Sequence, residues 1–253
     1  MKTSTLQYYL AQSKRKLPKP FLRWLVPIAI LPLLFGFLRN KREQPVAIPQ
    51  PVAERTAASA DFVLVIDDSG SAFGPSGTDP QGQRYNGARQ ILKILEEQAI
   101  GFDDRLGVVH FGSVVTSTPL SPVIEDATKI RKSLQLPNTN LGGTEYSTAL
   151  NEASRLFGTG QPDRKRVILF FTDGINNDSS AEIDTALSGL GSKDIHVFLY
   201  NVSAELRDQF VENAKYWKTR ATTVNKLYNL RGNRAERAFA RVLYRQLSIA
   251  TNE

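Results

Sequence analysis

Two hydrophobic patterns alternate along the chain from residue 61 onward. Short, nearly unbroken apolar runs, typical of buried strands in a parallel sheet, lie at 62–66, 106–111, 167–172 and 195–200. Between them, apolar residues recur every three or four positions, as they do on the buried face of a helix. Strands that alternate with helices predict an α/β fold: a doubly wound, mostly parallel sheet with helices on both faces.

Two further strands complete a predicted six-stranded sheet. One lies at 114–120 and the other around 223–228. The first contains Pro119, which cannot donate a hydrogen bond to a neighbouring strand, so we expect it to be antiparallel and at an edge. The run at 167–172 is apolar on both faces, which predicts a central strand. Helical patterns lie at 91–95, 127–134, 146–157 and 235–243. Two further helices are predicted, one that begins at Ser179-x-x-Glu182 and one that contains Phe210 and Trp217.

Oxygen-bearing side chains follow the first strand directly. Asp67, Ser69 and Ser71 come after the apolar run that ends at Ile66. In open α/β sheets the ligand sites lie at the carboxyl ends of the strands. Side chains two positions apart in such a loop can converge on one point, and carboxylate and hydroxyl oxygens suit a hard cation such as Mg²⁺ or Mn²⁺. The sequence therefore predicts part of a metal site here.

This pattern resembles the metal site of the von Willebrand factor A domain family, written D-x-S-x-S, then a distant Thr, then a distant Asp. The chain has Asp67-x-Ser69-x-Ser71, then Thr144, then Asp173, in the family's order. The resemblance extends over 61–248. It implies that Ser69, Ser71 and Thr144 bind Mg²⁺ or Mn²⁺ directly. It implies that Asp67 and Asp173 bind directly or through water, and that a Glu or Asp of a partner protein completes the metal shell.

Residues around the motif refine this expectation. Gly142 and Gly143 allow the loop before Thr144 to approach closely. Asp68 adds an acid within the motif, and it either points away or raises the affinity for cations. The Gly-, Pro- and Ser-rich stretch 72–84 is expected to be a loop. Its segment Thr78-Asp79-Pro80-x-x-x-Arg84 contains D-P-x-x-x-R, as some bacterial members of the family do. We interpret it as a turn with a helix-capping charge in preference to a ligand role.

The sequence favours a binding module over an enzyme. It contains no phosphate-binding G-x-x-x-x-G-K-[ST] and no G-x-G-x-x-G after a strand. Its two histidines, His110 and His196, lie inside predicted strands, and no serine has the context of a nucleophile elbow. Two alternatives remain open: a Mg²⁺-dependent hydrolase or phosphotransfer enzyme on a similar sheet, and a metal-independent assembly component of a cell-envelope complex.

Residues 21–38 form an apolar segment near the N-terminus. About eighteen residues make a helix about 27 Å long, just enough to span a bilayer. The first 42 residues contain nine Lys or Arg and no acid. Because Lys41 and Arg42 follow the segment directly, we interpret it as an uncleaved transmembrane helix and not as a cleaved signal peptide. The larger basic excess on its N-terminal side predicts a cytoplasmic N-terminus and an extracytoplasmic C-terminal domain.

The composition divides the chain into four parts. These are a basic tail at 1–20, the transmembrane helix at 21–38, a proline-containing linker at 39–60, and the von Willebrand factor A-like domain at 61–250. The net charge of +7 comes from the N-terminal part. The remainder is close to neutral, which gives no support for a nucleic-acid partner. The chain has no cysteine, so it has no disulfide framework and no cysteine-based site.

Overall fold

The fold is taken from a computed structural model, which describes residues 59–73, 77–98, 102–158, 164–174, 176–190, 194–200 and 215–226. The predicted basic tail, transmembrane helix and most of the linker lie outside these ranges. So do Phe210 and the helical pattern at 235–243. Within the described ranges, no helix has the length and apolar character needed to cross a membrane.

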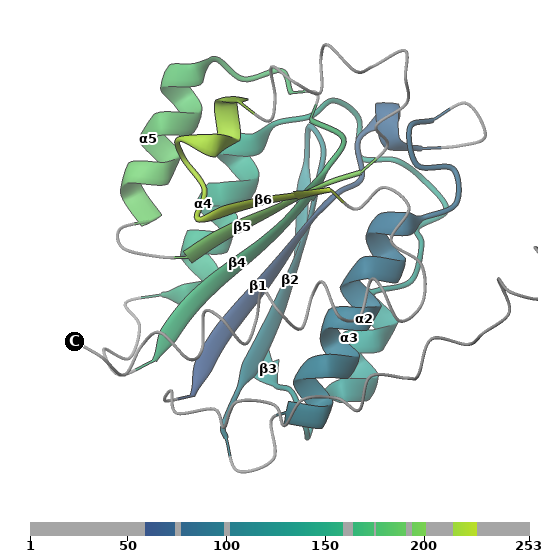
Figure 1. Cartoon of the computed structure of the whole chain (residues 1–253). Coiled ribbons are helices and arrows are strands. Elements are labelled where there is room, and N and C mark those ends of the chain that lie inside the picture. Colours follow the sequence, from purple (N-terminus) through teal and green to yellow (C-terminus); the bar gives the residue numbers. More distant parts are fainter. Residues whose placement is uncertain are drawn as a thin grey trace, which may run out of the picture. The chain divides into compact units, whose positions relative to one another are not determined.

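The described residues form a six-stranded sheet at the centre of the domain (Figure 1). Its spatial order is β3-β2-β1-β4-β5-β6. β3 pairs antiparallel with β2 at one edge, and the other four pairings are parallel. The predicted α/β class, the edge position of the strand with Pro119 and the interior position of β4 are therefore confirmed. The strands are β1 (Ala60–Asp67), β2 (Arg105–Phe111), β3 (Val115–Pro122), β4 (Lys165–Thr172), β5 (Asp194–Leu199) and β6 (Thr223–Lys226).

β1 is buried along its whole length because strands flank it on both sides and helices cover both of its faces. Its side chains alternate between the two faces. Phe62, Leu64 and Ile66 belong to one hydrophobic cluster, and Val63 and Val65 belong to the other. This position accounts for an apolar run without polar alternation.

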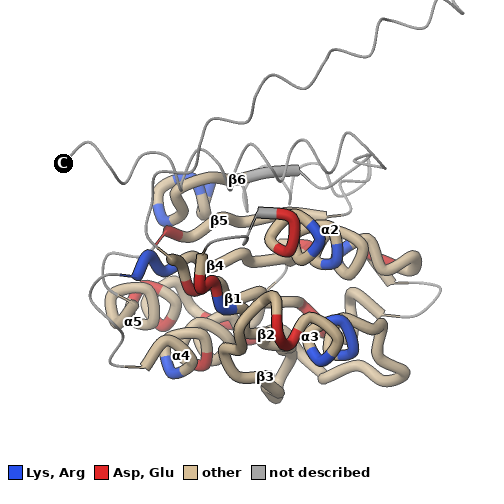
Figure 2. The backbone as a smooth tube through the Cα atoms, turned by 90° about the horizontal axis from the view of Figure 1, so that it is seen from below, with Lys and Arg blue, Asp and Glu red and all other residues tan. Residues whose placement is uncertain are grey.

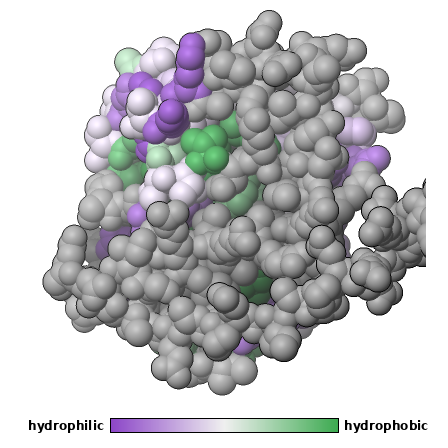
Figure 3. Space-filling view, viewed as in Figure 1, coloured by the Kyte–Doolittle hydropathy of each residue, from purple (hydrophilic) through white to green (hydrophobic). Residues whose placement is uncertain are grey.

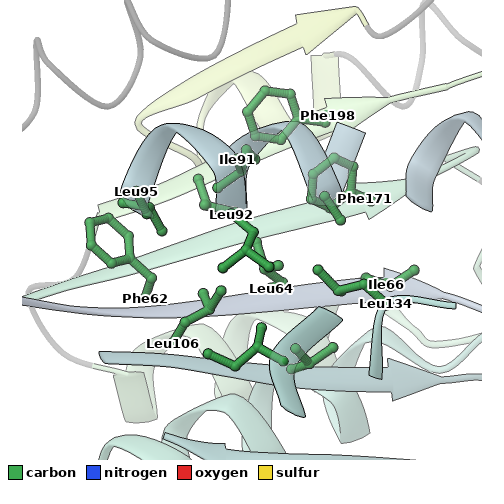
Figure 4. Close-up of a cluster of buried hydrophobic side chains, with 14 of the residues drawn as sticks. Phe62, Leu64, Ile66, Ile91, Leu92, Leu95, Leu106, Leu134, Phe171 and Phe198 are labelled. Atoms are coloured by element: carbon green, nitrogen blue, oxygen red, sulfur yellow. The ribbon is translucent and has the colours of Figure 1, made fainter. Parts of the chain in front are cut away.

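Among the described residues, helices cover both faces of the sheet (Figure 1). α2 (Gln83–Gln98) and α3 (Ala127–Ser133) lie on one face, and α4 (Tyr146–Phe157) and α5 (Ser180–Leu190) lie on the other. Figure 4 shows Ile91, Leu92 and Leu95 of α2 next to side chains of β1 in the first cluster. The apolar periodicity of α2 thus faces the sheet, as the sequence predicts.

α5 begins with the predicted capping box. The backbone N–H of Ser179 donates to Glu182 Oε2 at 2.8 Å, and the backbone N–H of Glu182 donates to Ser179 Oγ at 3.3 Å. The two side chains thereby satisfy N–H groups that the start of a helix leaves without partners. The described surface around α5 is mainly hydrophilic (Figure 3), as expected for the outer face of a covering helix.

Ion pairs close the amino end of the sheet, a feature that the sequence patterns did not reveal. Asp61 is fully buried and accepts hydrogen bonds from Arg105 Nε at 2.8 Å and from Arg164 Nε at 2.8 Å. The N–H of Ala60 donates to Asp104 Oδ1 at 2.8 Å. Figure 2 shows acidic and basic positions next to one another beside β1 and β4. These contacts fix the point at which the chain enters the sheet.

Candidate metal centre

Asp67, the last residue of β1, is completely buried. The N–H of Ser69 donates to its Oδ1 at 3.0 Å, and the hydroxyl of Thr172 donates to its Oδ2 at 2.9 Å. Burial and the negative charge of Asp173 raise the pKa of Asp67 to about 7, although these hydrogen bonds act to lower it. The hydrogen-bond donors to Asp67 among the described residues are neutral, so a bound cation would favour its ionised form.

A chain of hydroxyl groups connects the first loop to Asp173. Ser71 Oγ donates to Asp173 Oδ2 at 3.1 Å, and the Oγ atoms of Ser69 and Ser71 are 3.0 Å apart. A hydroxyl has a single hydrogen, and that of Ser71 is directed to Asp173. Ser69 and Ser71 are thereby linked to Asp173 through their hydroxyl oxygens. The structure brings these three predicted ligands together, and Asp173 is only 7% exposed.

Thr144 reaches the same edge of the sheet from the loop before α4. The N–H of Gly70 donates to the carbonyl oxygen of Gly142 at 2.6 Å, which holds the two loops against each other. Thr144 is buried, and its backbone exchanges hydrogen bonds with Asn177 on the loop after Asp173. The five predicted ligands therefore come from the end of β1 and from three loops at the same edge of the sheet.

Three glycines allow these loops to pack closely. Gly142 has a φ of +88°, a conformation that favours glycine. A Cβ on Gly143 would lie 2.8 Å from Ser113 Oγ, which accepts the N–H of Gly143 at 2.7 Å. The loop before Thr144 therefore packs closely, as expected, and the residue that it packs against is Ser113. A Cβ on Gly112 would lie 2.4 Å from the carbonyl oxygen of Leu141, a constraint that sequence reasoning missed.

Asp68 points away from the predicted metal site. Its Oδ1 accepts a hydrogen bond from Arg84 Nη2 at 3.1 Å, and its Oδ2 accepts one from Tyr85 Oη at 2.5 Å. A third hydrogen bond of 2.9 Å joins Oδ2 to His110 Nδ1. The side chain is buried on the face covered by α2, so the first of the two interpretations offered for Asp68 is correct.

Asp79 has the capping role expected for it. Its Oδ1 accepts the N–H of Gln83 at 2.7 Å, and its Oδ2 accepts the N–H of Arg84 at 3.0 Å. Arg84 Nη1 also donates to Oδ2 at 2.9 Å. Because this carboxylate satisfies the first N–H groups of the helix, α2 begins at Gln83. The predicted loop 72–84 is therefore too long at its end, and a short 3₁₀ turn, η1 (Gly70–Ala72), also overlaps its start.

The sequence did not reveal the supporting contacts of several further residues. Thr78 Oγ1 donates to Asp173 Oδ2 at 2.8 Å. Thr172 bridges Asp67 and Tyr146, whose Oη lies 2.6 Å from Thr172 Oγ1. Asp178 Oδ2 accepts the N–H of Ser147 at 2.6 Å and so caps α4 from another loop. Thr172 carried a usable signal, since it is the one polar residue at the end of an apolar strand. The other two depend on the folded loops.

The donor set fits a hard cation. It combines two buried carboxylates with hydroxyl groups, all at the carboxyl edge of the sheet. In the described part of the chain, no group of three or more His, Cys, Asp or Glu could hold a metal ion. A cation at this edge would therefore need the hydroxyl oxygens of Ser69, Ser71 and Thr144 in addition to the two aspartates.

Comparison with known families agrees with the motif and the fold. Residues 62–176 match the family described as von Willebrand factor type A domain. The chain is therefore similar to this family over residues 62–176. None of the curated proteins compared with the chain matches it.

Solved structures with a similar fold include several bacterial proteins. BatB from Bacteroides thetaiotaomicron is 19% identical, with a TM-score of 0.53 over 76% of this chain and 100% of that chain. The pilus adhesin SpaC from Lactobacillus rhamnosus GG is 13% identical, with a TM-score of 0.56 over 77% of this chain and 30% of the adhesin. A mutant of the PilB minor pilin from Streptococcus sanguinis is 11% identical, with a TM-score of 0.54 over 81% of this chain and 65% of the pilin.

These identities establish a shared fold and do not transfer an activity. The chain spans less than a third of the SpaC adhesin's length, so most of that protein has no counterpart in the alignment. The function of this domain has to be argued from its own residues.

Proposed function

We propose that this domain binds Mg²⁺ or Mn²⁺ and uses the bound cation to capture a Glu or Asp side chain of a partner protein. One observation carries the proposal: the carboxylates of Asp67 and Asp173 are both buried at the same edge of the sheet, and burial, together with the negative charge of Asp173, raises the pKa of Asp67 to about 7. A cation relieves the repulsion between the two carboxylates. The residues that would hold it are Asp67, Ser69, Ser71, Thr144 and Asp173.

When bound, the cation would supply a positive charge that the surrounding loops lack. The loops at 68–73, 77–82, 112–114, 135–145, 173–174 and 176–179 contain no Lys or Arg among their described residues. Within these described loop residues, a carboxylate from a partner would therefore meet no basic side chain, and the cation would supply the positive charge. Serine and threonine hydroxyls are neutral ligands, so Ser69, Ser71 and Thr144 would leave most of the cation's charge available to that carboxylate.

The histidine geometry supports a binding module and not an enzyme. His110 is held by Asp68, which points away from the predicted ligands, and its Nδ1 also lies 3.1 Å from Tyr85 Oη. His196 is fully buried within β5. Neither is placed to act as a general base beside Ser69 or Asp173, because such a base must lie within hydrogen-bond reach of the group that it deprotonates.

Addition of Mg²⁺ or Mn²⁺ to the full chain is expected to raise its melting temperature. At about one hundred times the Kd, the gain is about 2.7 kcal/mol, or roughly 5–10 °C for a domain of this size. The gain should shrink as the pH falls below about 7, because a proton on Asp67 competes with the cation. Thermal melts of two variants provide the test. Ser69→Ala should lose the shift, and Ser188→Ala, on the exposed side of α5, should keep it. A wild-type chain that responds to neither ion would contradict the proposal.

The same variants separate binding from the two alternatives. Thr144→Ala, Asp173→Ala and a chelator should each abolish co-purification of the partner from native membranes. Phosphate-ester or nucleotide hydrolysis that needs Mg²⁺ and disappears in Asp173→Ala would favour the enzyme. Partner capture that survives both substitutions and the chelator would favour metal-independent assembly.

We also propose that residues 21–38 anchor the chain in a membrane, with the N-terminus in the cytoplasm and the domain outside it. The flanking basic residues support this orientation, since the excess is larger on the N-terminal side. A reporter enzyme that works only outside the cytoplasm, fused to the C-terminus, is expected to be active. Activity confined to a reporter that works only in the cytoplasm would reverse the orientation and move the partner inside the cell.

A further inference from the structure

Thr78 contacts the predicted metal site although it lies outside the family motif. Its Oγ1 donates to Asp173 Oδ2 at 2.8 Å, a shorter contact than the 3.1 Å from Ser71 Oγ to the same oxygen. Both Thr78 and Ser71 therefore direct their single hydroxyl hydrogen at one carboxylate atom.

The backbone around Thr78 holds its hydroxyl in this position. The N–H of Thr78 donates to the carbonyl oxygen of Ser71 at 2.8 Å, which ties the loop to the first metal-site loop. The next residue, Asp79, is buried, accepts two N–H groups of α2 and forms an ion pair with Arg84. Thr78 is thus fixed from both sides.

Two hydroxyl donors leave little room for a cation on Asp173 Oδ2. A carboxylate oxygen has about two lone-pair positions, and Ser71 and Thr78 occupy both. Oδ2 can bind a cation directly only if one of these hydrogen bonds breaks. The Ser71 hydroxyl is itself a predicted metal ligand. Thr78 is not a predicted ligand, and its hydroxyl only donates the hydrogen bond that occupies Oδ2.

We propose that Thr78 is a positioning residue that orients the Asp173 carboxylate and keeps Oδ2 from binding the cation directly. This inference rests on the proposed metal-dependent function. A cation that is less neutralised by Asp173 retains more charge for the partner's carboxylate. Removal of the Thr78 hydroxyl should therefore strengthen metal binding and weaken carboxylate binding, two changes of opposite sign that a purely structural role would not produce.

The test uses the full chain with Mn²⁺ as the metal probe and acetate as the carboxylate probe. Thr78→Val removes the hydroxyl at nearly constant shape, and Thr78→Ser retains it. Thr116→Val, on an exposed position of β3, controls for the Thr-to-Val change. Calorimetry gives the Mn²⁺ affinity, water-proton relaxation counts the exchangeable waters on Mn²⁺, and an acetate titration follows displacement of those waters.

Thr78→Val is expected to bind Mn²⁺ about 3- to 10-fold more tightly, a range set by the net strength of one hydrogen bond. It should lose one exchangeable water and bind acetate more weakly, while Thr78→Ser and Thr116→Val should resemble the wild type. A Thr78→Val chain that equals the wild type in all three measurements would overturn the inference. So would one that binds Mn²⁺ more weakly, because Thr78 would then be a ligand itself. A wild-type chain without Mn²⁺ binding would overturn the proposed function as well.

Discussion

Replacement of Arg84 by Met is expected to destabilise the domain by about 3–5 kcal/mol, because it leaves two buried carboxylates without their cation. The Arg84 side chain is fully buried, donates to Asp68 Oδ1 at 3.1 Å and donates to Asp79 Oδ2 at 2.9 Å. Its guanidinium carbon also lies 5.1 Å from the ring centroid of Tyr85. Met replaces much of the volume but none of these interactions. Thermal or urea denaturation of the full chain measures the loss.

The matched control for this prediction is Arg155→Met. Arg155 also pairs with an acid, Glu152, but its side chain is 66% exposed and lies on the surface of α4. Exposed pairs contribute little because water and salt screen them, so this variant should remain close to the wild type. Equal losses in the Arg84 and Arg155 variants would show that the buried ion pairs around α2 do not stabilise the domain.

Acid is expected to act on the domain through His196. This side chain is fully buried in β5, with Nδ1 2.9 Å from Thr223 Oγ1 and with no hydrogen-bond partner for Nε2 among the described residues. Burial lowers the pKa of His196 from 6.5 to about 4. Between pH 6.5 and 4, His196 is therefore protonated in the unfolded chain and neutral in the folded chain. The free energy of unfolding falls as the pH falls from about 6.5 to about 4. The loss attributable to His196 is about 3 kcal/mol.

Asp67 acts in the opposite direction over much of this range. Because burial and Asp173 raise its pKa to about 7, the folded chain binds a proton that the unfolded chain releases, and stability rises as the pH falls below 7. In the metal-free wild type the two contributions partly cancel. A pH profile of the wild type alone therefore does not reveal the contribution of His196.

Comparison with His196→Gln isolates that contribution. In chelator-containing buffer, the stability difference between the two chains should shift by about 3 kcal/mol in favour of the variant between pH 7 and pH 4. Urea denaturation at several pH values measures it. Parallel profiles would mean that His196 titrates alike in the folded and unfolded chains.

The sequence allowed prediction of the sheet because its signals are local. The apolar run of β1 reflects burial on both faces, and Pro119 marks β3 as an edge strand. The motif similarly located Asp67 and Asp173 at strand ends, where topology brings them to the same edge. Their roles as metal ligands stay a prediction, since hydrogen bonds among the loops show proximity and not a bound ion.

Other features of the site depend on contacts between distant segments. Thr78 donates a hydrogen bond to Asp173, which lies 95 residues away in the sequence. Asp68 accepts a hydrogen bond from Arg84 because α2 packs against the sheet. The fit of Gly112 against Leu141 arises because two loops approach within van der Waals distance. Neither periodicity nor a short motif encodes such contacts, because residue spacing in the chain does not report distance in the fold.

The central position of β1 has a mechanical consequence. Its amino end is fixed by the contacts of Asp61, and its carboxyl end carries Asp67. A pull between a tether that precedes the domain and a partner held near Asp67 would run along this strand. The force would act in shear on the hydrogen bonds that join β1 to β2 and to β4. Hydrogen bonds on both sides of β1 would then carry the force together and would not break one at a time. The strand that ends at Asp67 is thus also held by two neighbouring strands along the direction of such a pull.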